Sequence, residues 1–202
     1  WKIIAQEDDK VPDSPAAPAM RFCAFDDSIG VSSSPDGVTF KAFSSDDIIL
    51  GCDNQKSWLP GIYRHTAPGP LETLAREDLS SDPSSTLPGT TYSNFKGAPV
   101  MNDWGDACFT ASTKGVIEKS YVFCCQFPAC DVGGALPTAV LGDGAISDQL
   151  DPIKVFTDLD VSDHGYLVVQ TSKGVFGVTD AIFGPASTAF TILEKGDNVP
   201  YL

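Results

Sequence analysis

The chain of 202 residues is poor in basic side chains, with 13 Lys and Arg against 27 Asp and Glu and a formal net charge of −14. Phosphate recognition needs clustered Lys and Arg, so this deficit argues against a nucleic-acid partner. No run of 18 apolar residues occurs, so we expect no insertion into a membrane. The chain begins with Trp1 and has no charged-then-apolar leader, which leaves a processed chain or part of a longer polypeptide as the alternatives.

The sequence also lacks the compact motifs of several enzyme classes. It contains neither a Gly-x-Ser-x-Gly nucleophile elbow nor a phosphate-binding Gly-x-x-x-x-Gly-Lys loop. Of its two histidines, His65 and His164, the second falls in an Asp-His-Gly turn, where a solvent-exposed side chain is expected. With 27 acidic residues, carboxylate pairs arise by chance and give no signal for glycoside hydrolysis. We therefore expect no enzyme activity, no catalytic residue and no cofactor.

Six cysteines are present, and their spacing leaves their redox state open. They are Cys23, Cys52, Cys108, Cys124, Cys125 and Cys130. An even number permits three disulfides in an oxidising compartment, and two of the cysteines flank a predicted hairpin turn, but buried free thiols are the alternative. No Cys-x-x-Cys pair or suitably spaced histidine accompanies them, and acidic turns such as 158–163 are expected to be solvated. We expect no metal site.

Three stretches have the pattern of the same β-hairpin, namely 28–43, 107–123 and 166–183. Each has an alternating apolar strand, a turn of the form Ser/Thr-x-Asp/Lys-Gly-Val and a second alternating strand. The turn glycines, predicted to be equivalent, are Gly37, Gly115 and Gly174. Hairpins that recur at intervals of tens of residues are typical of blades or stacked sheets. The sequence therefore predicts an all-β fold of antiparallel hairpin repeats, either propeller-like or a β-sandwich.

The predicted organisation is an N-terminal arm and one β-rich domain. Residues 1–20 are expected to form a short strand followed by an acidic, proline-rich arm that packs against something, and 21–202 form the domain. Within it, 65–99 is predicted to be an insertion with one short helix near 70–79, because Pro70 precedes leucines at helical spacing. A long loop follows this helix, and loops of such length are typical of functional or docking segments.

The first hairpin turn, SPDGVTF over 34–40, resembles the Asp-box or BNR repeat. The matching residues are Ser34, Asp36, Gly37, Thr39 and Phe40. Lysine replaces the aspartate in the other two copies, at positions 114 and 173. Asp-boxes occur in sialidases, secreted glycosidases, lectins and phage tail proteins, usually on β-propellers, where they are structural and lie away from active sites. The resemblance implies a structural role for this turn and an extracellular or virion-surface location.

Aromatic residues beside Asn, Asp or Gly in predicted loops are the best candidates for a binding site. They are Trp58, Tyr63, Tyr92 and Trp104. Sugar rings stack on exposed aromatics, and aromatics also anchor protein–protein contacts. We expect a non-enzymatic structural or attachment module of a virion or cell surface, assembling with other subunits through its loops and arm. A secreted carbohydrate-binding lectin that uses these aromatics is the alternative, and a glycosidase fragment is the third.

Overall fold

The structure is a computed structural model, which describes residues 3–12, 20–32, 37–47, 51–77, 90–116, 118–128, 137–142, 156–172, 174–178 and 189–194. Within these ranges the chain forms three antiparallel sheets of four strands each. The helices in the same ranges are two 3₁₀ turns of three residues. The predicted all-β fold of antiparallel hairpins is therefore confirmed.

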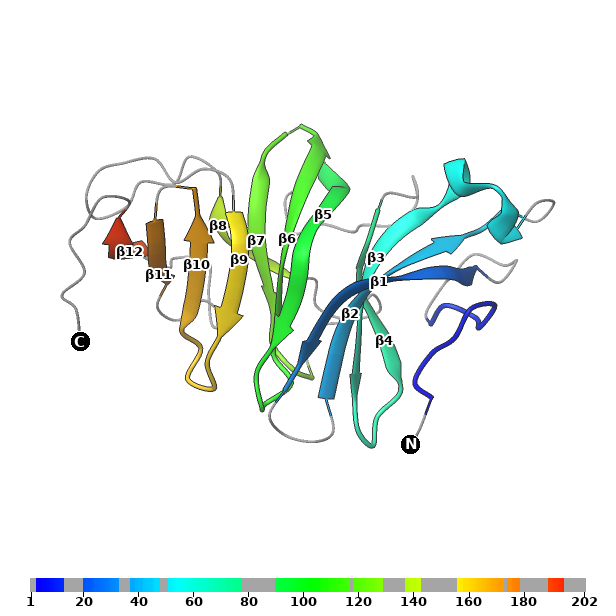
Figure 1. Ribbon diagram of the computed structural model, residues 1–202, viewed down its shortest axis with the longest axis horizontal. Helices are drawn as coiled ribbons and strands as arrows, with labels where there is room; N and C mark the ends of the chain where they lie inside the picture. Colours follow the sequence, from blue (N-terminus) through cyan, green and yellow to red (C-terminus); the bar gives the residue numbers. More distant parts are fainter. Residues whose placement is uncertain are drawn as a thin grey trace.

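Each sheet is a meander, in which every strand pairs with its neighbour in sequence. The first sheet contains β1 (Arg21–Val31), β2 (Gly37–Ser45), β3 (Leu59–Thr66) and β4 (Leu71–Arg76), with η1 (Gly51–Asp53) and η2 (Gln55–Ser57) between β2 and β3. The second contains β5 (Thr90–Met101), β6 (Ala107–Gly115), β7 (Ser120–Cys125) and β8 (Thr138–Gly142). The third contains β9 (Phe156–Val161), β10 (Leu167–Thr171), β11 (Gly174–Val178) and β12 (Ala189–Glu194). Figure 1 shows the three sheets side by side along the molecule, and β5 lies against both β1 and β9.

The second sheet is buried on both faces because alternate side chains of its strands pack on different neighbours. In β7, Phe123 packs toward the first sheet and Val122 and Cys124 toward the third. Side chains of a strand alternate between the two faces of its sheet, so a doubly covered strand is a continuous apolar run. In β10, by contrast, Val169 is buried and Val168 is partly exposed, as expected for a sheet covered on one face.

Two clusters of buried side chains join the sheets. The first seam, between the first and second sheets, consists of Ile62, Leu74 and Ala75 against Tyr92, Phe95, Met101, Ala107, Phe109, Ala111, Phe123 and Cys125. The second seam, between the second and third sheets, consists of Cys108, Val122, Cys124, Val140 and Leu141 against Phe156, Leu159, Val161, Leu167, Val169, Phe176 and Val178. These seams are the core that fixes the three sheets relative to one another.

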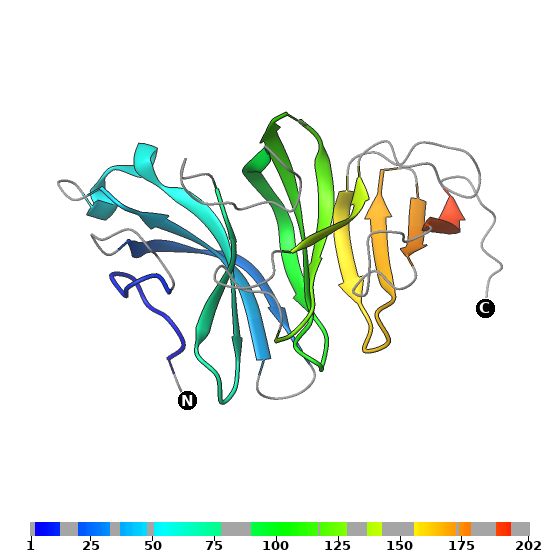
Figure 2. The ribbon, with the colours of Figure 1, turned by 180° about the vertical axis from the view of Figure 1, so that it is seen from behind.

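The described part of the N-terminal arm, residues 3–12, lies on the outer face of the first sheet (Figure 2). Backbone hydrogen bonds join Asp8 N–H to Phe22 O at 2.9 Å and Val11 N–H to Met20 O at 2.9 Å, and Val11 is completely buried. The strand predicted near the start of the arm is absent over 3–9, where the arm is irregular and makes one β-bridge, from Lys10 to Arg21.

The helix predicted near 70–79 is wrong over the residues that the structure describes. Residues 71–76 form β4, which pairs with β3, and residues 78–79 lie outside the described ranges. Leucines at helical spacing were the signal, but Thr73, Leu74 and Ala75 are all buried, so both faces of this segment are covered. Pairing with β3 satisfies its backbone and overrides the weak helical preference.

The predicted equivalence of the three turn glycines is also wrong. Gly37 begins β2, after the turn between the first and second strands of its sheet. Gly115 ends β6 and Gly174 begins β11, so both flank the turn between the second and third strands of their sheets. Of the turn residues predicted to be structural, Ser34 and Asp36 lie outside the described residues. Phe40 is buried on β2, and Gly37 packs closely beside the side chain of Met101, since a Cβ on Gly37 would meet Met101 Cε at 2.4 Å.

Candidate ligand-binding cleft

The turn between β5 and β6, residues 102–106, is organised by one buried asparagine. The side-chain oxygen of Asn102 accepts hydrogen bonds from Trp104 N–H at 3.0 Å and Asp106 N–H at 2.9 Å. Its backbone N–H donates to Asp106 O at 3.1 Å, and Gly105 N–H donates to Asn102 O at 3.1 Å. Gly105 has φ of +86°, a conformation that glycine adopts without strain. The sequence Asn-Asp-Trp-Gly therefore fixes the backbone that presents Trp104.

The turn between β9 and β10, residues 162–166, has the same construction. Ser162 N–H donates to Tyr166 O at 2.9 Å, Gly165 N–H donates to Ser162 O at 3.1 Å, and Ser162 Oγ accepts from Tyr166 N–H at 3.1 Å. Gly165 has φ of +78°. The two turns are therefore structural equivalents, and His164 occupies in one the position that Trp104 occupies in the other.

Hydrogen bonds hold these two turns next to each other. Asn102 Nδ2 donates to Ser162 O at 3.1 Å, and Asp103 N–H donates to Asp163 Oδ1 at 2.9 Å. The same Nδ2 also donates to Asp106 Oδ2 at 3.0 Å. Both turns lie at the lower edge of the second and third sheets in Figure 1. One asparagine thus determines both the shape of its own turn and its position beside the next sheet.

A cleft of about 460 Å³ lies between these turns. Its lining residues are Trp104, Asp106, Gln126, Phe127, Asp163 and His164. Phe127 N–H donates to Asp106 Oδ1 at 2.9 Å, which fixes the wall that follows β7. Binding pockets for small molecules commonly measure a few hundred Å³ and combine apolar surface with a few placed polar groups, and this cleft fits that description.

Arg64 of β3 supports this cleft from below. It is completely buried, its guanidinium lies 5.0 Å from the centre of the Phe127 ring, and its NH1 donates to Gly105 O at 3.0 Å. Glu72 neutralises it, since Oε2 accepts from Arg64 Nε at 2.9 Å and NH2 at 2.8 Å. The first sheet therefore supplies a buried guanidinium that packs beneath the cleft. The residues that line the cleft belong to the other two sheets.

The structure separates the four aromatic residues predicted to bind. Trp104 is 68% exposed and lines the cleft. Trp58 is half-buried, donates from Nε1 to Cys52 O at 3.0 Å and packs against Phe43. Tyr63 and Tyr92 are completely buried in the core, so neither can contact a ligand. Burial raises the pKa of Tyr63 to about 12 and raises that of Tyr92 as well.

The polar residues of the cleft are not among the predicted binding residues, although the sequence contains a signal for them. His164 is exposed in its turn, as the sequence predicts, and its equivalence to Trp104 follows from a repeated tetrapeptide pattern. The two tetrapeptides Asn-Asp-Trp-Gly and Ser-Asp-His-Gly start 60 residues apart and share the pattern Asn/Ser-Asp-x-Gly. That repeat identifies equivalent turns of neighbouring sheets more accurately than the glycines chosen from the sequence.

The described cysteines are disulfide-bonded. Cys23 pairs with Cys52, Cys108 pairs with Cys124, and Cys125 also forms a disulfide. Disulfides persist in oxidising environments, so they are compatible with a secreted or extracellular protein. Over the described ranges, no group of three or more His, Cys, Asp or Glu side chains could hold a metal ion, and no helix is long and apolar enough to cross a membrane.

Comparison with known proteins found no matching family model, no matching curated protein and no matching solved structure.

Proposed function

We propose that this chain is a non-enzymatic structural and attachment module of a cell or virion surface, which self-associates through the outer face of its first sheet. The observation that carries the proposal is an apolar groove on that face, beside the N-terminal arm. In this proposal the three meanders act as blade-like units, since propeller blades are also four-stranded antiparallel sheets.

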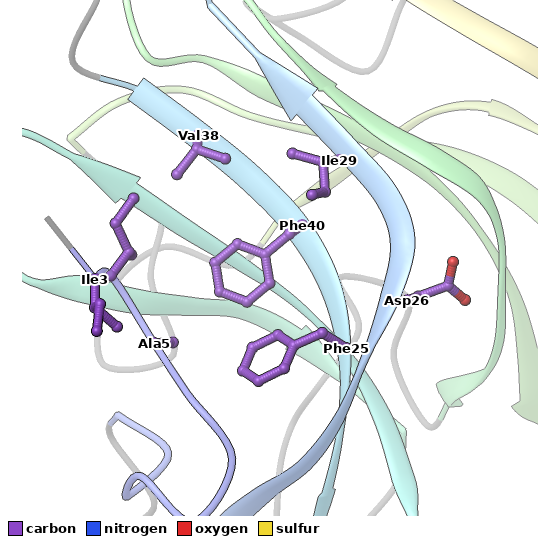
Figure 3. Close-up of a pocket in the computed structure, with 8 residues that line it drawn as sticks. Ile3, Ala5, Phe25, Asp26, Ile29, Val38 and Phe40 are labelled. Atoms are coloured by element: carbon purple, nitrogen blue, oxygen red, sulfur yellow. The ribbon is translucent and has the colours of Figure 1, made fainter. Parts of the chain in front are cut away.

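The groove has a volume of about 280 Å³ and is lined almost entirely by apolar side chains. They are Ile3, Ile4, Ala5, Phe25, Ile29, Val38 and Phe40, with Asp26 at the edge. Figure 3 shows the aromatic rings of Phe25 and Phe40 together, with Ile29 and Val38 beside them and Ile3 of the arm opposite. Contiguous apolar surface of this kind on a soluble domain is typical of an interaction site.

Exposure on this face extends beyond the groove along β1. Ile29 is 55% exposed and Val31, which lies on the same side of the strand two residues later, is 70% exposed. The arm therefore leaves both side chains largely open to solvent. The arm residue Ile3 is itself 72% exposed. Exposed aliphatic side chains from both the sheet and the arm thus form one surface that a partner would cover.

A second copy of this chain is the occupant that the charges favour. The protein carries a net charge of −14, which opposes self-association, but the one acidic side chain among the described residues that line the groove is neutralised. Asp26 Oδ2 lies 2.9 Å from Lys41 Nζ, and the carboxylate points away from the apolar side chains in Figure 3. A symmetric dimer brings the same face of both copies together, so an uncharged face suits it.

Light scattering coupled to size exclusion tests this proposal on the whole chain. We expect a dimer of twice the 21.4 kDa chain mass, and we expect Val31→Asp to convert it to a monomer, because a symmetric interface would bring two like charges together. The matched control is Val116→Asp, since Val116 is 77% exposed on a different sheet, in the turn after β6.

The control variant should keep the oligomeric state of the wild type. A wild-type monomer at concentrations up to the millimolar range contradicts self-association, and so does a dimer that both aspartate variants disrupt equally. Circular dichroism of both variants separates loss of association from loss of folding.

A further inference from the structure

We propose that the cleft between the β5–β6 and β9–β10 turns binds a neutral carbohydrate, with a sugar ring stacked on Trp104. The cleft lies on the second and third sheets, away from the apolar face of the first sheet, so this inference does not depend on the proposed self-association. It does give the attachment role a ligand class and a location.

Trp104 is the part of the cleft that an apolar ligand face would cover. Its side chain is 68% exposed although its backbone is fixed by Asn102, so the ring is presented to solvent by a rigid turn. A tryptophan on a pre-organised backbone loses little conformational entropy on binding, which makes it an effective anchor. The C–H face of a pyranose ring is a flat apolar surface of suitable size for such an indole.

The polar lining supplies both hydrogen-bond acceptors and donors for hydroxyl groups. Asp163 uses Oδ1 to accept from Asp103 N–H at 2.9 Å, which orients the carboxylate and leaves its second oxygen available to a ligand. Gln126 and His164 are exposed and can each donate or accept. Since a sugar hydroxyl both donates and accepts, this mixed set is more suitable for hydroxyls than a set of one polarity would be.

The charges of the cleft select neutral ligands. Among the described residues that line it, Asp106 and Asp163 contribute carboxylates and none is Lys or Arg. Arg64, a cation close to the cleft, is completely buried, contacts Gly105 and Phe127 and is paired with Glu72. Phosphate, sulfate, sialic acid and uronic acid groups would therefore meet repulsion that the site does not offset.

The test is a printed array carrying neutral and sialylated glycans, followed by calorimetric titration of the strongest neutral hit into the full chain. We expect binding to neutral glycans and not to their sialylated forms. Trp104→Ala should weaken the affinity at least tenfold with an unchanged melting temperature, because the exposed indole contributes little to folding. Asp163→Asn should weaken it by a smaller factor.

Trp58→Ala is the matched control, since Trp58 packs on Phe43 and lies outside the cleft. This variant should lower the melting temperature and keep the affinity. No binding to any neutral glycan overturns the proposal, as does a preference for sialylated glycans or an affinity that Trp104→Ala leaves unchanged. The proposal would also be overturned if the cleft bound a protein through Trp104 and did not bind a glycan.

Discussion

The two seams of the middle sheet join similar sheets by different chemistry. The first seam is aromatic, with ring contacts that link four side chains, Tyr92, Phe95, Phe109 and Phe123. The second seam is mainly aliphatic and contains the disulfide between directly opposed residues of β6 and β7, Cys108 and Cys124. The same strands supply both sets, because adjacent residues point to opposite faces.

This difference shows how each seam is held together beyond hydrophobic burial. A buried side-chain cation stabilises the first seam: Arg64 of β3 donates a hydrogen bond to the β5–β6 turn. The second seam is closed at its end by the hydrogen bonds between the two equivalent turns, from Asn102 to Ser162 and from Asp103 to Asp163. The cleft lies where these two systems meet, so its shape depends on both seams.

The largest expected effect on this comparison comes from removing a ring in the first seam. Phe109 lies 5.6 to 5.9 Å, between ring centroids, from Phe123, Phe95 and Tyr92. Phe109→Ala should lower the free energy of unfolding by about 4 kcal/mol, from lost burial and the cavity left behind. Urea denaturation followed by circular dichroism measures it.

The matched change in the second seam is Val169→Ala, which removes a smaller buried side chain. It should cost about 2 kcal/mol, because fewer carbon atoms lose contact. Equal losses in the two variants would contradict the expectation that the cost follows the number of buried carbon atoms removed.

Removing the buried cation should cost less than Phe109→Ala and more than Val169→Ala. Arg64→Met leaves the Glu72 carboxylate, whose side chain is 16% exposed, and the Gly105 carbonyl without their partner. Truncating one member of a buried pair typically costs 3–5 kcal/mol, and because Glu72 keeps some solvent access the expected loss is about 3 kcal/mol. The double variant with Glu72→Gln should recover part of it, and a double-mutant cycle measures the coupling. An additive pair would contradict direct interaction.

Removing the disulfide of the second seam should cost slightly less. Cys108 and Cys124 are separated by 16 residues, and a cross-link over a loop of that size contributes about 3 kcal/mol in the loop-closure account, with native-state relaxation reducing it. We expect the paired change Cys108→Ala and Cys124→Ala to lower the midpoint of urea unfolding while the far-ultraviolet spectrum stays that of a β protein. An unchanged midpoint would show that burial alone holds this seam.

The sequence predicted the fold class well and the site only in part, for physical reasons. Alternation of apolar residues at hairpins such as 107–123 is a local signal, so strands β6 and β7 could be predicted from it. The equivalence of turns depends on which strands pair, which is a property of the whole sheet, so local sequence similarity does not identify the turns that correspond to the one before Gly37. Burial was not predictable for Tyr63 and Tyr92, because loop-like neighbours such as Gly61 and Asn94 also occur inside strands.

The smallest expected effect is a gain in stability within the first seam. The Tyr92 hydroxyl is buried and has no hydrogen-bond partner among the described residues, which is unfavourable because the group has left water without compensation. Tyr92→Phe should raise the free energy of unfolding by about 1 kcal/mol at neutral pH.

The gain should grow as pH rises above 10, because burial raises the pKa of Tyr92 in the folded protein while the unfolded chain ionises near its ordinary value. The free energy of unfolding of the wild type therefore falls as pH rises. The variant has no hydroxyl at position 92 to ionise, so it does not lose this part of its stability. Phe109 lies in the same ring cluster and has no hydroxyl group, so it is an example of a buried ring in this environment without one. Thermal melts of both proteins from neutral to alkaline pH measure the difference, and a variant that is less stable than the wild type at neutral pH would show that the hydroxyl has a partner after all.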